Sequence, residues 1–331
     1  MAQIQLSIAI GDYDQTRDVI SGRVAVEGVE LIPSLVPPEE VFHRFWTYLE
    51  WDISEAPMGR YASMRSQDDN RITAIPVFVS RVFRHSMIYV RDDGRIMRPE
   101  QLKGARIGVP EWAQTATIYM RGLLMHDAEV PLESVHWVQA GVNMPGREEM
   151  VKLKLPENVT CQRIRDRSLN EMLLAGDLDA VLSARLPAGF GNGIRRLYGD
   201  FEQAEEAYYR KTGIFPIMHV LAVRTEVLER HPWLAMNLVK AFEEAKQRSI
   251  MRLSDITASH FPLAWIRPYT DRMRSLFGED FWPYGVENNR ATLEAFFHFA
   301  LSARTNARNS RAVQAAGSSY SIDRRWPGSS A

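Results

Sequence analysis

The sequence lacks several features that would place it in a specialised class of protein. Its 331 residues include a single cysteine, Cys161, so neither an intrachain disulfide nor a cysteine-based zinc site can form. This composition favours a reducing compartment. The 40 basic residues are balanced by 41 acidic ones, and the net charge of −1 argues against nonspecific binding to nucleic acids, which requires a basic surface.

Long apolar runs and common nucleotide-binding motifs are also missing. No segment approaches the ~20 apolar residues of a membrane-spanning helix. Residues 3–8 alternate polar and apolar side chains and residues 1–10 contain neither Lys nor Arg, which is typical of a strand and not of a signal peptide. We therefore expect a cytoplasmic protein without a membrane partner. The phosphate-binding loop, the dinucleotide-binding glycine pattern and the H-E-x-x-H zinc motif are absent too.

Strand-like and helix-like segments alternate along most of the chain, which predicts an α/β fold with largely parallel sheets. The length is sufficient for two lobes. Strands are predicted near residues 4–10, 28–32, 72–77, 134–139 and 219–223, and long helices near residues 113–124, 232–253 and 288–303. Residues 304–331 are polar and rich in Ser, Arg and Gly, so we expect a C-terminal arm or tail there.

Two segments place charged groups and histidines at the start of strand-like runs. Residues 80–90 contain Arg81, Arg84 and His85 just before an apolar run, and residues 211–220 place His219 at the start of another. Two guanidiniums beside an imidazole can bind a small acid and also transfer a proton. We therefore predict that the two segments meet at one cleft.

Several longer motifs accompany these segments, at residues 11–14, 54–55, 80–90, 108–111, 208–219, 282–285 and 288–290. Together they resemble the 4,5-dihydroxyphthalate decarboxylase family, and the resemblance extends from about residue 4 to residue 303. It implies a cytoplasmic relative of the type II periplasmic solute-binding proteins, which have two α/β lobes, two crossover strands and a ligand cleft between the lobes.

The implied fold divides the chain into discontinuous parts. Residues 1–90 and 218–303 would form the first lobe and residues 91–217 the second, with residues 304–331 as the arm. Residues 87–90 would be the outgoing crossover strand and residues 219–223 the return. The cluster of arginines and histidines would then lie near the hinge side of the cleft, where ligands of open α/β folds bind.

The resemblance also implies a reaction, the removal of one carboxylate from 4,5-dihydroxyphthalate to give 3,4-dihydroxybenzoate (protocatechuate) and carbon dioxide during phthalate degradation. Direct loss of carbon dioxide would leave an unstable aryl anion. Protonation of the ring carbon, assisted by the hydroxyl group para to it, instead gives a dearomatised ketone that releases carbon dioxide and regains aromaticity. Because the ring is its own electron sink, no organic cofactor is expected.

Such a site needs cations for two carboxylates, a base for the phenol and an acid for the ring carbon. The residues expected to contact the substrate are Arg81 and Arg84, as carboxylate clamps, with Ser86, Asp12, Thr115 and Arg185. The candidate catalytic residues are His85 and His219, as acid and base in either order, and Glu55 and Glu111, which would take the phenolic proton or orient a histidine.

Three alternatives to this interpretation remain at the level of the sequence. The two histidines and two glutamates could instead hold a divalent metal ion, although no local spacing supports a metal site, and we favour a metal-free reaction. The chain could be a solute-binding protein that delivers an aromatic acid to a transporter or sensor. It could also be another enzyme of this fold, such as one of thiamine-pyrimidine synthesis, but that reading predicts a cysteine or histidine cluster and Cys161 stands alone. We expect a small aromatic dicarboxylate as the ligand and no nucleic-acid partner. We also expect a homo-oligomer, in which the C-terminal arm of one subunit could wrap a neighbouring subunit.

Overall fold

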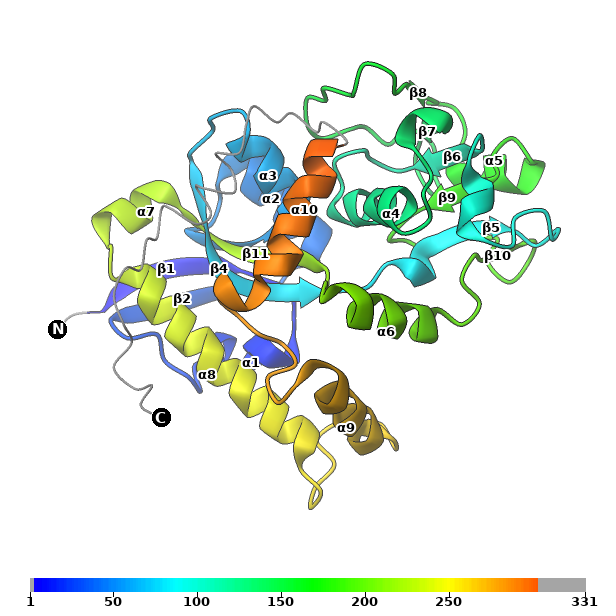
Figure 1. Ribbon diagram of the computed structural model, residues 1–331. Coiled ribbons are helices and arrows are strands. Elements are labelled where there is room, and N and C mark those ends of the chain that lie inside the picture. The colour runs from blue at the N-terminus through cyan, green and yellow to red at the C-terminus, as the bar shows by residue number, and fades with distance from the viewer. Residues whose placement is uncertain (1–2, 303–331) are drawn as a thin grey trace.

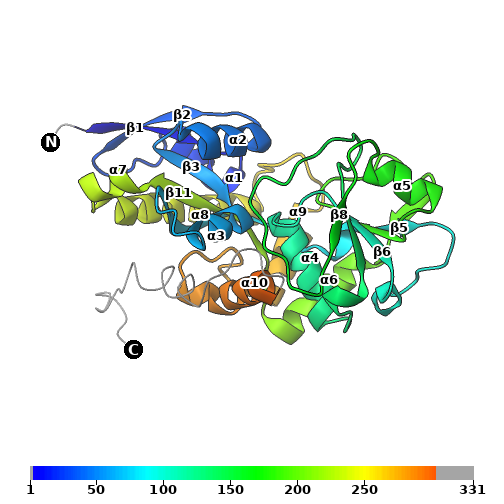
Figure 2. The ribbon, with the colours of Figure 1, turned by 90° about the horizontal axis from the view of Figure 1, so that it is seen from above.

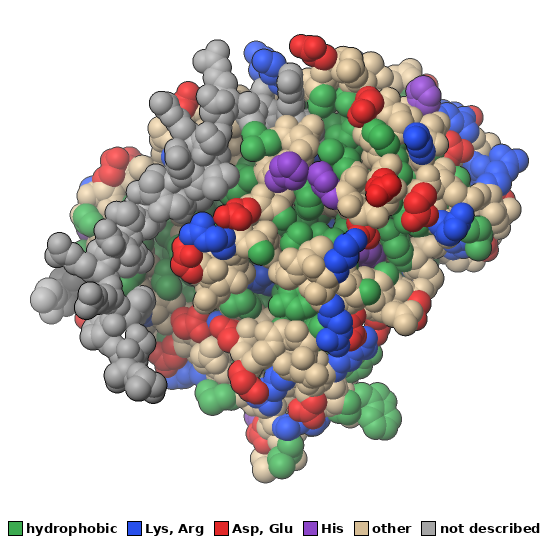
Figure 3. All heavy atoms as spheres, viewed as in Figure 1, with side chains coloured by type: hydrophobic (Ala, Val, Ile, Leu, Met, Phe, Trp, Pro, Cys, Tyr) green, Lys and Arg blue, Asp and Glu red, His purple; other side chains and the backbone are tan. Residues whose placement is uncertain are grey.

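The computed structural model describes residues 3–302 and arranges them in two lobes, each built on a mixed β-sheet (Figure 1). The first sheet has the strand order β2-β1-β3-β11-β4, and the second has the order β10-β5-β9-β6-β7-β8. The predicted C-terminal arm, residues 304–331, lies outside the described residues. Lys and Arg side chains alternate with Asp and Glu side chains over the face shown in Figure 3.

The first lobe combines five strands with helices on both faces of the sheet. The strands are β1 (Ile4–Ala9), β2 (Val29–Ser34), β3 (Ile53–Pro57), β4 (Ile72–Arg81) and β11 (Ile217–Arg224). The helices are α1 (Asp14–Ile20), α2 (Pro38–Tyr48), α3 (Met58–Arg65), α7 (Thr225–Arg230), α8 (Leu234–Ser254), α9 (Ile266–Phe277) and α10 (Arg290–Ser302). Strands β1, β2 and β3 are parallel, whereas β11 runs antiparallel to both β3 and β4.

The second lobe contains the remaining six strands. These are β5 (Ile88–Arg91), β6 (Arg106–Val109), β7 (His136–Gln139), β8 (Cys161–Arg163), β9 (Ala180–Leu182) and β10 (Ile194–Arg196). Its helices are α4 (Thr115–His126), α5 (Leu169–Ala175) and α6 (Phe201–Thr212), and short 3₁₀ turns lie at η1 (His85–Met87), η2 (Pro99–Leu102) and η3 (Leu132–Ser134). A fourth turn, η4 (Glu287–Asn289), precedes α10 in the first lobe.

The periodicity of the sequence explains the main elements. Leu6 and Ile8 of β1 are buried at a spacing of two, as expected for a strand with one covered face. Helix α8 buries Leu234, Leu238 and Phe242 at spacings of four, which forms the apolar stripe that packs over the sheet. No helix within residues 3–302 is both long enough and apolar enough to cross a membrane.

The chain crosses between the lobes twice, from β4 to β5 and from α6 back to β11. This confirms the predicted two-lobed α/β fold with two crossover segments. The outgoing crossing precedes residues 87–90, which mostly belong to β5 in the second sheet. The exact lobe boundaries stay a prediction.

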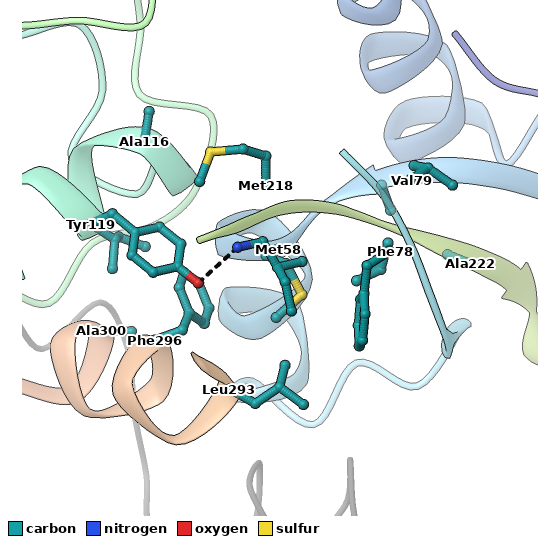
Figure 4. Packing of buried hydrophobic residues seen from close by; sticks show 14 of the residues in the cluster. Met58, Phe78, Val79, Ala116, Tyr119, Met218, Ala222, Leu293, Phe296 and Ala300 are labelled. Carbon is teal, nitrogen blue, oxygen red and sulfur yellow. Dashed lines mark hydrogen bonds between the residues drawn. The ribbon is translucent and has the colours of Figure 1, made fainter. Parts of the chain in front are cut away.

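Apolar side chains join the two lobes on one side of the molecule. Helices α3 and α10 of the first lobe both contact α4 of the second (Figure 2). Figure 4 shows Tyr119 of α4 beside Phe296 of α10, and the two ring centroids lie 5.3 Å apart. The hydroxyl of Tyr119 accepts a hydrogen bond of 3.2 Å from the backbone N–H of Ile217 at the start of β11. The second crossover is thereby fixed to the second lobe.

Candidate active site

A cavity of about 520 Å³ lies between the two lobes. The first lobe contributes side chains from α2, α3 and β11, and the second contributes the start of α4 and the segment 146–151. The volume falls within the ~300–1,000 Å³ of typical small-molecule sites. A smaller cavity of about 290 Å³ adjoins it and shares Glu39, Gln114 and Arg147 with it.

A buried carboxylate orients a histidine at the wall of this cavity. Strands β3 and β11 are neighbours, and they bring the carboxylate of Glu55 to 2.5 Å from Nδ1 of His219. Glu55 is fully buried and accepts two further hydrogen bonds, of 2.6 Å from the hydroxyl of Tyr13 and 2.9 Å from the N–H of Gly11. The ring of His219 lines the cavity and packs edge-on against Phe42.

The environment of Glu55 favours its charged form. Burial alone would raise the pKa of this carboxyl, but the charge and hydrogen bond of His219, together with the bonds from Tyr13 and Gly11, outweigh burial and lower the pKa. Burial and the charge of Glu55 raise the pKa of the Tyr13 phenol far above its usual value, so that Tyr13 is a neutral donor. Because a carboxylate only accepts hydrogen bonds, Nδ1 of His219 carries the hydrogen, and Nε2 is the nitrogen that can exchange a proton.

Two arginines line the same cavity without a carboxylate partner among the described residues. The guanidinium of Arg84 contacts only sulfur atoms, at 3.2 Å from Met218 and 2.7 Å from Met87, and burial lowers its pKa to about 10. The guanidinium of Arg60 lies over the ring of Trp46 at 5.1 Å, and burial lowers its pKa as well. Neither guanidinium forms an ion pair among residues 3–302, although the charges of Glu111 and Glu149 act on Arg60 and that of Glu205 acts on Arg84. The pair is therefore suited to receive an anionic ligand.

The second lobe contributes carboxylates to the opposite wall. Glu111 is bound by the guanidinium of Arg147, with a hydrogen bond of 2.8 Å from Nε. Oε2 of Glu149 accepts a hydrogen bond of 2.5 Å from the N–H of Trp112. Burial, followed by the charge of Glu111, raises the pKa of Glu149 to about 7. Glu149 therefore holds a proton more readily than an ordinary carboxyl group does.

Several sequence-predicted residues occupy the cavity and others do not. The structure brings together His219, Glu111, Arg84 and Thr115 at the cavity wall, with Glu55 directly behind His219. The hydroxyl of Thr115 already accepts a hydrogen bond of 2.9 Å from the N–H of Gly59, so Thr115 bridges the lobes.

Arg81 is not among the cavity residues, contrary to the prediction. Its guanidinium donates hydrogen bonds of 3.1 Å and 2.7 Å to the carbonyl oxygens of Phe215 and Pro283, and it also contacts the side-chain oxygen of Asn289. These bonds use both of its terminal nitrogens, while the buried Nε has no hydrogen-bond partner among the described residues. Arg81 therefore ties β4 to the segment before α10, and this position away from the cavity does not support its predicted role as a carboxylate clamp.

His85 is likewise placed away from the cavity. Its side chain is only 2% exposed, packs against the rings of Tyr198 and Tyr208, and lies 3.9 Å from the carboxylate of Glu205. Burial lowers the pKa of His85 to about 4, so its imidazole is neutral at physiological pH. Ser86 follows it in the same turn and donates its N–H to Glu205 at 3.3 Å. Neither residue lines the cavity, so their position does not support the predicted roles.

The last two predicted residues also lie elsewhere. Asp12 is exposed in the loop after β1. Arg185 lines the smaller adjoining cavity, where it forms an ion pair with Glu39. Among residues 3–302, no group of three or more His, Cys, Asp and Glu side chains is arranged to hold a metal ion.

Sequence reasoning overlooked Tyr13, Arg60, Arg147 and Glu149. Tyr13 belongs to the family-like motif at residues 11–14, but the sequence does not show that its hydroxyl reaches Glu55. Arg60 follows Glu55 by five positions and lies in the first turn of α3, which directly follows β3, and this proximity was the available signal. Arg147 and Glu149 lie in an irregular segment between β7 and β8, where no periodicity points to a site.

The chain is similar to several known proteins. No family model matches the chain. Solved structures that match include a desulfurization enzyme, at 17% identity and a TM-score of 0.46 over 96% of this chain and 100% of that one. The periplasmic aliphatic sulphonate binding protein from Escherichia coli matches at 10% identity and a TM-score of 0.46, over 96% and 91% of the two chains. These two matches do not bear on activity.

Two curated relatives are much more similar. The chain is 39% identical over 300 residues to the 4,5-dihydroxyphthalate decarboxylase of Comamonas testosteroni, which covers 89% of this chain and 91% of that protein. It is 38% identical over 214 residues to the 4,5-dihydroxyphthalate decarboxylase of Pseudomonas putida, over 63% and 83% of the two chains. The resemblance seen in the motifs is thus confirmed, and the chain belongs to the 4,5-dihydroxyphthalate decarboxylase family.

Proposed function

We propose that this protein is a carboxy-lyase that converts 4,5-dihydroxyphthalate to 3,4-dihydroxybenzoate and carbon dioxide without an oxidant. One observation carries the proposal. Two guanidiniums without carboxylate partners, Arg60 and Arg84, line the same cavity as a histidine held by a buried carboxylate. The first feature suits a dianionic ligand and the second suits proton transfer, and the names of the two curated relatives supply a reaction that needs both.

Binding would use the two arginines as separate carboxylate receptors. Arg84 comes from the crossover segment and Arg60 from the start of α3, so the ligand would bridge two parts of the hinge side of the cleft. Each guanidinium can form two parallel hydrogen bonds with a carboxylate, and such charge-assisted bonds are stronger in a site with little water. A monoacid would leave one of these buried cations unpaired.

Proton abstraction would begin at His219. Its Nε2 takes the proton from the hydroxyl group para to the carboxylate that leaves, and the anionic Glu55 stabilises the imidazolium that forms. Electrons then move from the phenolic oxygen into the ring and make the carbon bearing that carboxylate basic. A well-placed base of this kind contributes ~10² to 10⁴ to the rate. When carbon dioxide leaves, the electron pair of the broken bond restores the aromatic ring.

The test measures carbon dioxide release from 4,5-dihydroxyphthalate by the purified protein, with and without a chelator. We expect release in both conditions. Arg60→Met and Arg84→Met should each raise KM by ~10²-fold or more, because truncating one partner of a buried charge pair typically costs 2–5 kcal/mol. Arg185→Met removes the same charge from the adjoining cavity and should leave KM near the wild-type value.

Three results would count against the proposal in different ways. Saturable binding of the acid without carbon dioxide release would identify a solute-binding protein. Activity that stops with a chelator and returns with a divalent ion would require a metal. Normal KM values in both arginine variants would remove them from the substrate site.

A further inference from the structure

Glu149 reaches the cavity from the segment between β7 and β8. Its Oε2 accepts the 2.5 Å hydrogen bond from the N–H of Trp112, just before α4. Its Oε1 is buried and has no hydrogen-bond partner among the described residues. A buried carboxylate oxygen without any donor is unfavourable when charged, whereas a neutral carboxyl group can occupy such a position at lower cost.

Titratable and charged groups surround Glu149 on several elements. Glu111 follows β6, Arg121 lies on α4 and Arg60 lies on α3, while the Cys161 thiol on β8 is kept neutral because burial raises its pKa to about 12. The buried guanidinium of Arg121 does not pair with Glu149, because it stacks on the ring of Trp112 at 3.9 Å and donates a 2.8 Å hydrogen bond to the carbonyl of that residue. Burial and the charge of Glu111 therefore prevail, and the pKa of Glu149 rises to about 7.

The other carboxyl groups at the cavity are already committed to cations or donors. Glu111 is paired with Arg147, Glu39 with Arg185 and Glu148 with Arg163. Glu55 accepts three hydrogen bonds and orients His219. Among the described residues, Glu149 is thus the cavity-lining glutamate that has no ion pair, and it is suited to hold a proton.

We propose that Glu149 is the acid that protonates the ring carbon during decarboxylation. This inference rests on the proposed function, in which His219 acts as the base. Substrate in the cavity would meet the carboxyl group after it turns from the wall toward the ring. The O–H bond of Glu149 breaks as a C–H bond forms at the carbon that carries the leaving carboxylate. The bond from that carbon to the carboxylate then breaks, carbon dioxide departs with its electron pair left in the ring, and solvent returns a proton to Glu149.

The test compares Glu149→Gln with Glu149→Asp and with the matched control Glu133→Gln. Glu133 is an exposed glutamate in η3 of the same lobe and does not line the cavity, so its substitution should not change activity. Glu149→Gln keeps the hydrogen-bond acceptor for Trp112 but cannot donate a carboxylic proton. We expect kcat to fall by ~10² to 10⁴ with KM within a few-fold of wild type, and Glu149→Asp to restore part of kcat.

Two further readouts separate an acid from a merely structural residue. The wild-type kcat should decrease as pH rises through about 7, and this decrease should vanish in the residual activity of Glu149→Gln. In D₂O the wild-type protein should exchange the hydrogen at C6 of 3,4-dihydroxybenzoate, which NMR detects, because protonation of that carbon is reversible. Glu149→Gln should lose this exchange while the protein still binds the product.

The outcomes distinguish this inference from the proposed function. If the wild-type protein turns over and Glu149→Gln has normal kcat or normal C6 exchange, Glu149 is not the acid and the proposed function is unaffected. The same conclusion follows if Glu149→Gln has a lowered kcat that still decreases as pH rises through about 7. Absence of turnover in the wild-type protein would overturn the proposed function, and the role of Glu149 with it.

Discussion

The backbones of the two lobes lie close together at Gly59, and a methyl group there should force them apart. The N–H of Gly59 donates a 2.9 Å hydrogen bond to the hydroxyl of Thr115. A Cβ atom at Gly59 would lie 3.0 Å from the backbone nitrogen of Thr115 and still closer to the carbonyl oxygen of Ala113. Both neighbours are backbone atoms and cannot rotate out of the way.

The size of the effect follows from these contacts. Carbon–oxygen contacts normally lie at ~3.3–3.6 Å, so the two backbones must separate by roughly 1 Å. The bond between Gly59 and Thr115 would then exceed the usual hydrogen-bond range. Arg60 is the next residue and would move with its backbone. A displacement of roughly 1 Å in a substrate-positioning group can reduce the rate about 10²-fold, and overpacking of this kind lowers the free energy of unfolding by about 1–3 kcal/mol.

The assay measures kcat/KM from carbon dioxide release and the free energy of unfolding from denaturant titration. Gly199→Ala is the matched control, because a Cβ atom there meets no atom within 4 Å. Thr115→Val removes the interlobe hydrogen bond without adding bulk to Gly59 and should have a smaller effect than Gly59→Ala. If Gly59→Ala has wild-type kcat/KM, the close contact between these backbones is not needed in the catalytically active conformation.

Two more predictions concern buried groups near the site. Tyr13→Phe removes the 2.6 Å hydrogen bond to Glu55, and we expect kcat to fall roughly 10-fold, equivalent to about 1.4 kcal/mol. Tyr13 helps to lower the pKa of Glu55, so this carboxyl group should be protonated at higher pH in the folded variant than in the folded wild type. The variant should therefore lose less stability than wild type as pH falls below about 4.5, and an unchanged acid unfolding profile would contradict the reasoning. Burial raises the pKa of Glu205 to about 7 in the folded protein, and Glu205→Gln tests this assignment. As pH rises, Glu205 loses its proton in the unfolded state before it does so in the folded state, so the stability of the wild-type protein should fall between pH 4.5 and about 7. The variant should be more stable than wild type at pH 8 by up to about 3 kcal/mol, with no difference at pH 4, and an equal difference at both pH values would refute the assignment.

The sequence could identify segments of the site more readily than the direction of individual side chains. Glu55 and His219 were both selected, and the structure joins them across 164 positions in the sequence through neighbouring strands. In residues 80–90, by contrast, three charged side chains were assigned to one cleft and only Arg84 reaches it. Strand β4 extends through Arg81, and a 3₁₀ turn begins at His85, so three nearby residues face three different environments. The direction in which each side chain points depends on where the strand ends, because a shift of one residue places a side chain on the opposite face of the sheet.

Arg60 and Glu149 show a different limit of prediction from the sequence, because neither was recognised as a site residue. Arg60 is half-buried on α3, and as an arginine in a short helix it has the sequence character of a surface residue. Glu149 lies in a segment without regular structure next to other charged residues, which resembles a solvated loop. Both become informative only when the folded chain brings them to the same cavity. This proximity is a property of tertiary packing that no local pattern encodes.

The contacts of Glu55 bear on why a two-lobed binding fold would perform chemistry. Binding an aromatic dicarboxylate requires cations and an apolar wall, which Arg60, Arg84 and Phe42 supply at the cavity. A fully buried carboxylate adds nothing to that task, since burying an ion pair is on balance neutral or unfavourable compared with apolar packing. Here three donors, from Tyr13, Gly11 and His219, keep Glu55 ionised directly behind the ring that lines the cavity. In the proposed function this arrangement serves proton transfer to the His219 ring, whereas a solute-binding site would have no use for a buried carboxylate at that position.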